Sequence, residues 1–261
     1  MTRAAGSIYL GTSGYAYDHF RGLLYPKGLA ASKWLPRYAE VFCTLEVNAT
    51  FYRLQSRETF ERWCKATPKG FRFACKGSRY LTHMKRLLDV EQGLDRFFDP
   101  LVGLSGKVGP VLWQLPPQMK PDLERLDHFL GELPKRLAPR ARTKLRYVVE
   151  FRSVEWYDPA VCDVLDRHGV AFCEHDLVDR SPPRQTGGFR YLRFHGKTGK
   201  YSGRYGRATL RRHAEDLASS RARGEDAWVF FNNDTHGHAL YDAVDLGELL
   251  GLDVPLQLPS P

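Results

Sequence analysis

Charged side chains stand at the ends of several apolar, strand-like segments of this 261-residue chain. Glu46 lies at the end of the second segment, Lys76 follows the third, and Glu150 lies at the end of the fifth. A carboxyl group whose pKa is raised by burial can act as a general acid or base, and an ammonium group can polarise an oxygen or keep a carboxylate ionised. We therefore take Glu46, Lys76 and Glu150 as the candidate catalytic residues.

Other polar side chains at the same strand ends suit recognition of a ligand. Guanidinium groups are planar forks that match phosphate or carboxylate, amide side chains can position hydroxyls or base edges, and a histidine can shuttle a proton. The candidate substrate-binding residues are Tyr15, Asn48, Gln114, Arg152, Arg193, His195, Asn232 and Asn233. The structural alternative is that the charges only stabilise the fold as ion pairs. Those pairs would be Glu46 with Lys76 and Glu150 with Arg152.

Eight apolar segments alternate with amphipathic helical patterns along the chain. The strand-like segments cover residues 8–10, 42–47, 71–75, 110–115, 147–151, 170–173, 189–194 and 228–231. Between them, Ser56, Asp122 and Asp158 are suited to cap the first turn of a helix, and Ser32 opens a further one. Residues 177–188 lack helical periodicity, so we expect a loop in place of the sixth helix.

The number of segments favours a single-domain α/β fold, a (β/α)8 TIM barrel, over residues 1–261. The barrel itself is expected at about residues 7–251, with a C-terminal tail at 252–261. In such a barrel the loops that follow the strands converge at the C-terminal face. The polar strand ends would then surround one cavity.

Composition narrows the class of protein. The chain carries a formal charge of +9 and has a pI near 9.3, which favours anionic ligands through its electric field. No apolar stretch approaches the roughly 18 residues of a membrane span, and the start lacks the apolar core of a secretory signal. The five cysteines form no C-x-x-C motif, so we expect small buried side chains in a reducing compartment. These features predict a cytoplasmic protein without membrane contact.

The segment after the seventh strand mixes cations with aromatic residues and glycines. Its cations and tyrosines are Lys197, Lys200, Tyr201, Arg204, Tyr205 and Arg207. Such a mixture can grip phosphates and stack bases, although a solvated lid has the same composition. The segment is not a P-loop, because Tyr191 stands where that motif requires glycine. It supports an alternative function as a nucleic-acid-binding module without catalysis.

Histidines and acidic residues give weaker support to a metal site. The candidates are His175, Asp176, His195, His236 and His238. The last two fall at a helix start after the eighth strand, and too few of the five side chains face one point. We therefore expect no cofactor, with a divalent metal as the less favoured alternative.

A series of short motifs occurs in a particular order along almost the entire chain. They are Gly11-Thr12-Ser13-Gly14-Tyr15, Glu46-Val47-Asn48 with Thr50-Phe51-Tyr52, Lys76, Gln114-Leu115-Pro116-Pro117, Glu150-Phe151-Arg152, Arg193-Phe194-His195-Gly196 and Asn232-Asn233-Asp234-Thr235-His236-Gly237-His238-Ala239. In these motifs the chain resembles the YecE-like uncharacterised TIM-barrel proteins. The resemblance implies the barrel and a polar pocket at its mouth, and it implies no particular reaction.

Taken together, the patterns predict an enzyme with a polar, cationic pocket. We expect a hydrolase or lyase that acts on a phosphorylated sugar or a nucleotide-containing substrate through carboxylate and lysine acid–base chemistry. The expected partner is an anionic small molecule, and nucleic acid is the alternative partner. The sequence leaves the oligomeric state open.

Overall fold

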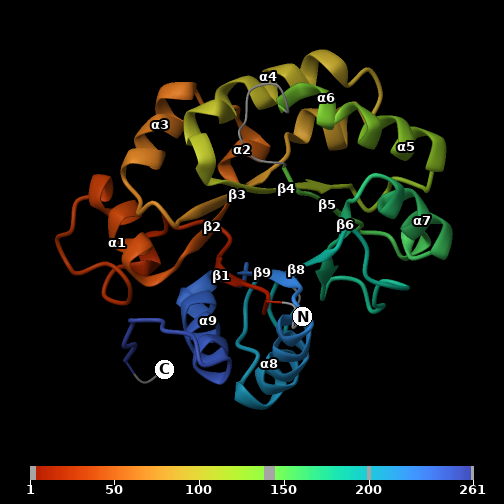
Figure 1. Cartoon of the computed structure of the whole chain (residues 1–261). Coiled ribbons are helices and arrows are strands. Elements are labelled where there is room, and N and C mark those ends of the chain that lie inside the picture. The colour runs from red at the N-terminus through yellow and green to blue at the C-terminus, as the bar shows by residue number, and fades with distance from the viewer. Residues whose placement is uncertain (1–3, 138–144, 199–200, 260–261) are drawn as a thin grey trace. The chain divides into compact units, whose positions relative to one another are not determined.

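The protein has an α/β fold whose strands form a four-stranded and a five-stranded sheet (Figure 1). The computed structural model describes residues 4–137, 145–198 and 201–259. The strand orders are β1-β9-β8-β7 and β2-β3-β4-β5-β6. The chain divides into two compact units, of which unit 1 is Met1–Glu46 with Leu192–Pro261 and unit 2 is Val47–Tyr191.

Every predicted strand segment overlaps a strand of the structure. The strands are β1 Ile8–Thr12, β2 Thr44–Val47, β3 Arg72–Lys76, β4 Val108–Gln114, β5 Tyr147–Glu150, β6 Ala171–Phe172, β7 Glu174–His175, β8 Phe189–Phe194 and β9 Asp226–Phe231. The two-residue strand β7 was not predicted, because it is too short to show a pattern of its own.

The helices lie between the strands, as the alternating pattern predicts. They are α1 Trp34–Val41, α2 Ala49–Tyr52, α3 Arg57–Lys65, α4 Glu91–Leu101, α5 Leu123–Glu132, α6 Pro134–Leu137, α7 Pro159–Arg167, α8 Arg207–Ala222 and α9 His238–Leu249. Short 3-10 turns occupy Asp18–Phe20, Ala31–Lys33, Val102–Lys107, Val154–Trp156 and Thr235–Gly237, and one π-helical turn occupies Tyr80–Met84. Residues 177–188, all of which are described, contain no helix, as predicted.

The helix starts confirm the three predicted caps. Ser56, Asp122 and Asp158 each accept a hydrogen bond from a backbone N–H in the first turn of α3, α5 and α7. Ser32, which was predicted to open a helix, lies in the 3-10 turn Ala31–Lys33 that runs directly into α1, and the α-helix itself begins two residues later, at Trp34.

In unit 1, strand β1 pairs with β9 in parallel, from Ile8 opposite Ala227 to Thr12 opposite Phe231. Phe231 stacks on Phe194 of β8, with ring centroids 4.8 Å apart. Helix α9 packs on β1 and β9, and α8 packs on β9 (Figure 1). Side chains alternate between the two faces of a strand, so the neighbours of Phe194 and Phe231 in sequence point away from these helices.

In unit 2, strands β3, β4, β5 and β6 pair in parallel in that order. Trp113 of β4 packs against Phe97 of α4 and Phe129 of α5. A methyl group at Gly77 would overlap the Trp113 ring, so only glycine fits directly after β3. The residues on either side of Trp113 therefore point to the face that the helices leave uncovered.

The five cysteines are all free. Cys75, Cys162 and Cys173 are buried, as predicted, and Cys64 is half-buried. Cys43 is exposed, because it lies in the bend before β2 and not among the packed strands. None of the described helices is both long enough and apolar enough to cross a membrane.

Candidate functional site

Three predicted site residues of unit 2 share one face of its sheet. Gln114 lies opposite Glu150 across the β4–β5 pair, and Lys76 lies opposite Leu112, two residues before Gln114. Because residues two apart point to the same side of a strand, these side chains all point away from Trp113 and its helices. Each of the three is buried at the carboxyl end of its strand.

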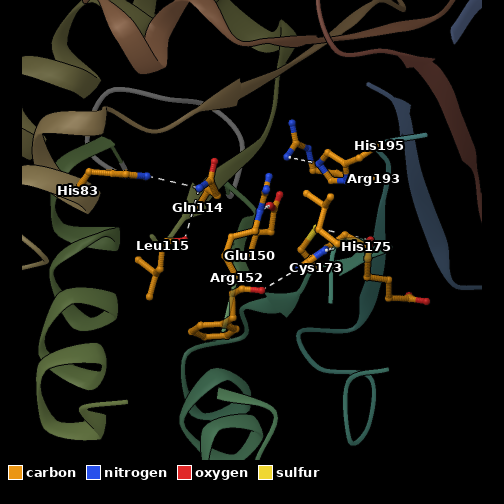
Figure 2. A network of polar contacts seen from close by, with 12 residues as sticks. His83, Gln114, Leu115, Glu150, Arg152, Cys173, His175, Arg193 and His195 are labelled. Atoms are coloured by element: carbon orange, nitrogen blue, oxygen red, sulfur yellow. Dashed lines mark hydrogen bonds and ion pairs between the residues drawn. The ribbon is translucent and has the colours of Figure 1, made fainter. Parts of the chain in front are cut away.

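Glu150 is paired with Arg152, two residues along the chain. The Nε atom of Arg152 donates a hydrogen bond to Oε1 of Glu150, and the carboxylate is fully buried (Figure 2). This contact confirms the ion pair that the spacing predicted. The other suggested pair, Glu46 with Lys76, joins residues of different units and stays a prediction.

His83 joins this group, although the sequence did not single it out. It lies in the π-helical turn Tyr80–Met84, and such turns occur often at functional sites. Its Nδ1 is 2.9 Å from Oγ1 of Thr82, and its Nε2 is 3.5 Å from Nε2 of Gln114 (Figure 2). Since the amide nitrogen of Gln114 only donates, this arrangement fits a ring with its proton on Nδ1 and its lone pair on Nε2.

The Phe51 ring joins His83 to the cation of Lys76. The Lys76 ammonium lies 4.3 Å from the centroid of the Phe51 ring, and the His83 ring meets the same ring edge to face at 5.1 Å. Burial, together with the positive charges of Lys76, Arg79 and Arg152, lowers the pKa of His83 to about 4. At neutral pH His83 is therefore an uncharged imidazole in a positive field.

His175 has a structural role in the same unit. Its Nε2 lies 2.8 Å from the carbonyl oxygen of Phe151 and 3.2 Å from the hydroxyl of Tyr157, and its Nδ1 accepts a hydrogen bond from the backbone of Leu177 (Figure 2). Both ring nitrogens thus hold the chain around β7. This use explains the histidine without a metal ligand role.

Unit 1 contains a second polar cluster, built on Glu46. Ser13 donates a hydrogen bond of 2.6 Å to Oε1 of Glu46, and Arg193 contacts both carboxylate oxygens through Nη2 at 2.8 Å and Nε at 3.0 Å. All three side chains are buried. A two-pronged contact of this kind is the strongest form of the arginine–carboxylate pair, and it balances one negative charge with one positive charge.

Arg193 also fixes the protonation of His195. Its Nη1 lies 3.1 Å from Nε2 of His195 (Figure 2). A guanidinium can only donate, so Nε2 must accept and the ring must be neutral with its proton on Nδ1. The ring of Tyr201 meets His195 edge to face, with centroids 5.7 Å apart.

The two consecutive asparagines after β9 have different surroundings. Asn233 donates to the carbonyl oxygen of Gly203 at 2.9 Å and to Oδ2 of Asp242 at 2.7 Å, so it anchors a loop to α9. Asn232 is also buried, but its side chain makes no hydrogen bond with any residue that the structure describes. Of the two, Asn232 has its whole amide available for a ligand, whereas Asn233 has only its buried Oδ1 left without a partner among the described residues.

The segment after β8 is held by acidic residues of α9. Arg204 pairs with Asp245 at 2.6 Å, and Arg207 pairs with Asp245 at 2.8 Å and with Glu248 at 2.7 Å. Asp242 accepts from the backbone N–H of Tyr205. Burial raises the pKa of Asp242 to about 6.

These ion pairs compensate two of the cations on which the nucleic-acid alternative rests. Lys197 and Tyr205 line an open groove of about 920 Å³ together with α9 and the residues near the C-terminus. Lys200 lies outside the described residues.

Tyr15 and Asn48 complete the predicted set. Burial raises the pKa of Tyr15, whose carbonyl oxygen accepts a hydrogen bond from the Tyr25 hydroxyl at 2.6 Å. Asn48 precedes α2, and its buried Oδ1 has no hydrogen-bond partner among the described residues. Tyr15 belongs to unit 1 and Asn48 to unit 2.

The described residues contain no group of three or more His, Cys, Asp or Glu side chains arranged to hold a metal ion. His236 and His238 have ring centroids 5.9 Å apart, and Nδ1 of His238 accepts a hydrogen bond from the backbone of Gly203. As the sequence predicts, His238 stands at the start of a helix, α9.

Fold and geometry thus define an α/β protein with buried polar clusters at the carboxyl ends of its strands. The chain belongs to the family described as "Protein of unknown function DUF72", whose model matches residues 9–261.

Relatives of known sequence and structure agree with this assignment. The chain is 28% identical to the UPF0759 protein YunF of Bacillus subtilis (strain 168), over 94% of this chain and 95% of that protein. A DUF72 family protein of Thermotoga maritima MSB8 has a TM-score of 0.77 at 26% identity, over 94% of this chain and 99% of that one. One from Enterococcus faecalis V583 has a TM-score of 0.78 at 19% identity, over 97% and 99%. These structures share the fold of this chain.

Proposed function

We propose that the protein is an enzyme whose unit 2 binds the phosphate group of a small substrate, a phosphorylated sugar or a nucleotide. The observation that carries the proposal is the gathering of Lys76, Arg79 and Arg152 around His83. All three lower the pKa of His83 through their positive charge, so the field at this ring is positive. A dianion is the ligand that such a field favours.

His83 supplies a base within this field. Its depressed pKa keeps Nε2 unprotonated at neutral pH, and Thr82, which donates its own hydroxyl proton to the carbonyl oxygen of Ser78, holds the proton on Nδ1. A histidine oriented through one nitrogen and able to accept a proton at the other is the usual form of a general base, and the contact of Nε2 with the Gln114 amide is long, at 3.5 Å. We propose that Nε2 accepts the proton of an attacking water or of a substrate hydroxyl.

Lys76 and Glu150 keep their proposed catalytic roles beside this base. The Lys76 ammonium would stabilise negative charge on the departing oxygen, and Glu150, once Arg152 turns towards the substrate anion, would take the proton that His83 has removed and pass it to that oxygen. Glu46 accepts hydrogen bonds from Ser13 and Arg193, so we propose that it positions Arg193 and does not itself transfer protons.

The proposal includes three broader points, which concern the closed barrel, the cellular location and the alternative function. The order of strands and helices supports one domain that closes as a (β/α)8 barrel of the YecE-like type. The free cysteines support a cytoplasmic location. Nucleic-acid binding by residues 196–207 is the alternative function, and it has less support because Arg204 and Arg207 are paired with carboxylates.

Calorimetric titration with inorganic phosphate and with ribose 5-phosphate tests the binding step. Lys76→Met should weaken both affinities by about 10- to 100-fold, because a charge-assisted contact is lost. Lys85→Gln is the matched control, since Lys85 lies one residue beyond the same turn but pairs with Asp89 at 3.1 Å. Equal phosphate affinity in the wild type and the Lys76 variant would refute the binding site.

Turnover tests the catalytic step separately. Among phosphorylated sugars and nucleotides, we expect a substrate whose turnover falls by about 100-fold or more in His83→Gln while phosphate affinity changes little. Unchanged turnover in His83→Gln and Glu150→Gln would remove both residues from the mechanism.

A further inference from the structure

The side chain of Asn232 is buried without a hydrogen-bond partner in the described part of the chain. It is 7% exposed, and it is not among the side chains with further interactions. Among the described residues, its amide atoms are not in the set of polar atoms that are both fully buried and unpartnered, so the exposed part of the residue leaves the amide accessible to a ligand. The neighbouring Asn233 donates to Gly203 and Asp242 and keeps only its buried Oδ1 without a partner. An accessible, unused amide on an otherwise buried residue points to a ligand.

The strand register places Asn232 inside the polar cluster of unit 1. Thr12 lies opposite Phe231, so the following residues, Ser13 and Asn232, are also level. The backbone N–H of Asn232 donates to the carbonyl oxygen of Phe194, which brings Asn232 beside His195 on the other strand. Ser13, Asn232 and His195 therefore form a row across the ends of β1, β9 and β8.

All members of this row point to the same face. Asn233 turns to Asp242 on α9, so Asn232, the preceding residue, must point to the opposite face. Phe194 stacks on Phe231 on the helix side, so Arg193 and His195 also point away from the helices. Ser13 contacts Glu46 on that same face.

The charge of the cluster selects the class of ligand. Glu46 and Arg193 balance each other, and His195 is neutral because its Nε2 faces the Arg193 guanidinium. A charged ligand would upset this balance in a buried place, whereas a hydroxyl group can both donate to and accept from the amide of Asn232. The complementary ligand is therefore uncharged and rich in hydroxyls.

Tyr201 adds an aromatic surface to the same cluster. Its ring contacts His195 and is 44% exposed, and its backbone has a φ of 57°, which a residue with a side chain rarely adopts. The loop that carries it is tied down through Gly203 by Asn233 and His238. A held, half-exposed tyrosine ring suits the apolar face of a sugar ring.

We propose that Asn232 and Tyr201, within the row of Ser13 and His195, form a binding site for an uncharged sugar or polyol. The amide of Asn232 bonds to ring hydroxyls, and the Tyr201 ring packs on the ring face. This site goes beyond the proposed phosphate site, because it is built from unit 1 alone and requires no anionic group.

Two-dimensional ¹H–¹⁵N NMR of the side-chain amides tests the site in the full chain. Glucose, xylose, ribose and myo-inositol, each unphosphorylated, are titrated up to about 0.1 M, since sugar sites of this kind have millimolar affinities. At least one should shift the Asn232 side-chain signals and leave those of the anchored Asn233 in place. No shift of the Asn232 signals with any of the four would overturn the proposal and leave Asn232 as a group that only water solvates.

Variants make the assignment specific. Asn232→Ala removes no hydrogen bond within the described protein, so it should keep the unfolding midpoint of the wild type and weaken sugar binding by at least 10-fold. Tyr201→Ala should weaken it by a smaller factor, about 3- to 10-fold. Sugar affinity that is unchanged in Asn232→Ala would overturn the proposal. Phosphate binding in unit 2 is measured separately, from the signals of His83. Its outcome is independent of the sugar titration.

Discussion

The polar clusters of the two units differ in how their charges are arranged. In unit 1, Glu46 is held by both prongs of Arg193 and by Ser13, so the charges of the cluster balance. In unit 2, burial and the positive charges of Lys76, Arg79 and Arg152 hold the pKa of His83 far below its ordinary value. Glu46 and Arg193 thus offset each other in the first cluster, whereas the charges that act on His83 in the second are positive.

The comparison teaches that polar residues at strand ends do not share one task. A balanced pair favours rigid positioning and a neutral ligand, because any added charge would be buried without compensation. An excess of cations favours an anion and keeps a nearby histidine neutral. The predictions below separate these two behaviours, from the largest expected effect to the smallest.

The largest effect is expected from breaking the balanced pair. Arg193→Met leaves Glu46 buried without its main partner, and we expect the free energy of unfolding to fall by about 3–5 kcal/mol in urea denaturation. Arg207→Gln, which removes the surface ion pairs with Asp245 and Glu248, should cost less than about 1 kcal/mol.

The double variant Glu46→Gln with Arg193→Met sharpens this result. Because it removes both charges, it should be more stable than Arg193→Met alone. A loss below about 1 kcal/mol in the single variant would mean that the pair does not organise unit 1.

A smaller effect concerns Asp242, the anchor of the loop in unit 1. Burial raises its pKa to about 6, so the folded protein binds this proton more tightly than the unfolded chain. Its contribution to stability therefore grows as the pH falls from about 6 to about 4, and is lost as the pH rises. Asp242→Asn should abolish this dependence. The difference in free energy of unfolding between this variant and the wild type should change by on the order of 2 kcal/mol between pH 4 and pH 6. A constant difference would contradict the raised pKa.

The smallest effect has the opposite sign and belongs to His83 of unit 2. Its folded pKa of about 4 lies below the ordinary value of 6.5, so its contribution is present above about pH 6.5 and is lost on acidification towards pH 4. Relative to His83→Gln, the free energy of unfolding of the wild type should fall by about 1 kcal/mol as the pH drops over this range. The loss is small because the ring is only partly buried and is screened by solvent. Thermal unfolding at several pH values measures it. A wild type that becomes more stable relative to the variant on acidification would contradict the lowered pKa of His83.

Much of the fold could be predicted from the sequence, because its signals are local. Ser56 and Asp158 cap their helices through hydrogen bonds to residues within three positions, and such contacts depend on few neighbours. Alternation of strand residues puts Glu150 and Arg152, two positions apart, on one side of the chain. The same alternation correctly joined Glu150 to Arg152.

The remaining details depend on contacts between distant segments. Nothing in the consecutive pair Asn232-Asn233 reveals which amide is used, since the answer lies on α9, where Asp242 accepts from Asn233. From the sequence, Arg204 and Arg207 indicate a basic surface. The structure shows that carboxylates of α9 pair with both of them.

His83 was missed for a similar reason. It lies in a π-helical turn, a geometry without a sequence signature, and its neutral state arises from its burial and from cations that include Lys76 and Arg152 on other segments. Its position shortly after Lys76, in the segment that follows a strand, was the one available signal. In a barrel-like pattern of strand ends, such histidines belong among the candidates.

The central claim is that unit 2 has a positive field that an anion relieves, and an NMR titration of the His83 ring tests it most directly. The ring should titrate near pH 4 in the protein alone, and saturating sulfate, whose charge stays constant over this range, should raise that midpoint clearly. Lys85→Gln should titrate as the wild type does. A His83 ring that titrates near its ordinary value and does not respond to sulfate would contradict the account.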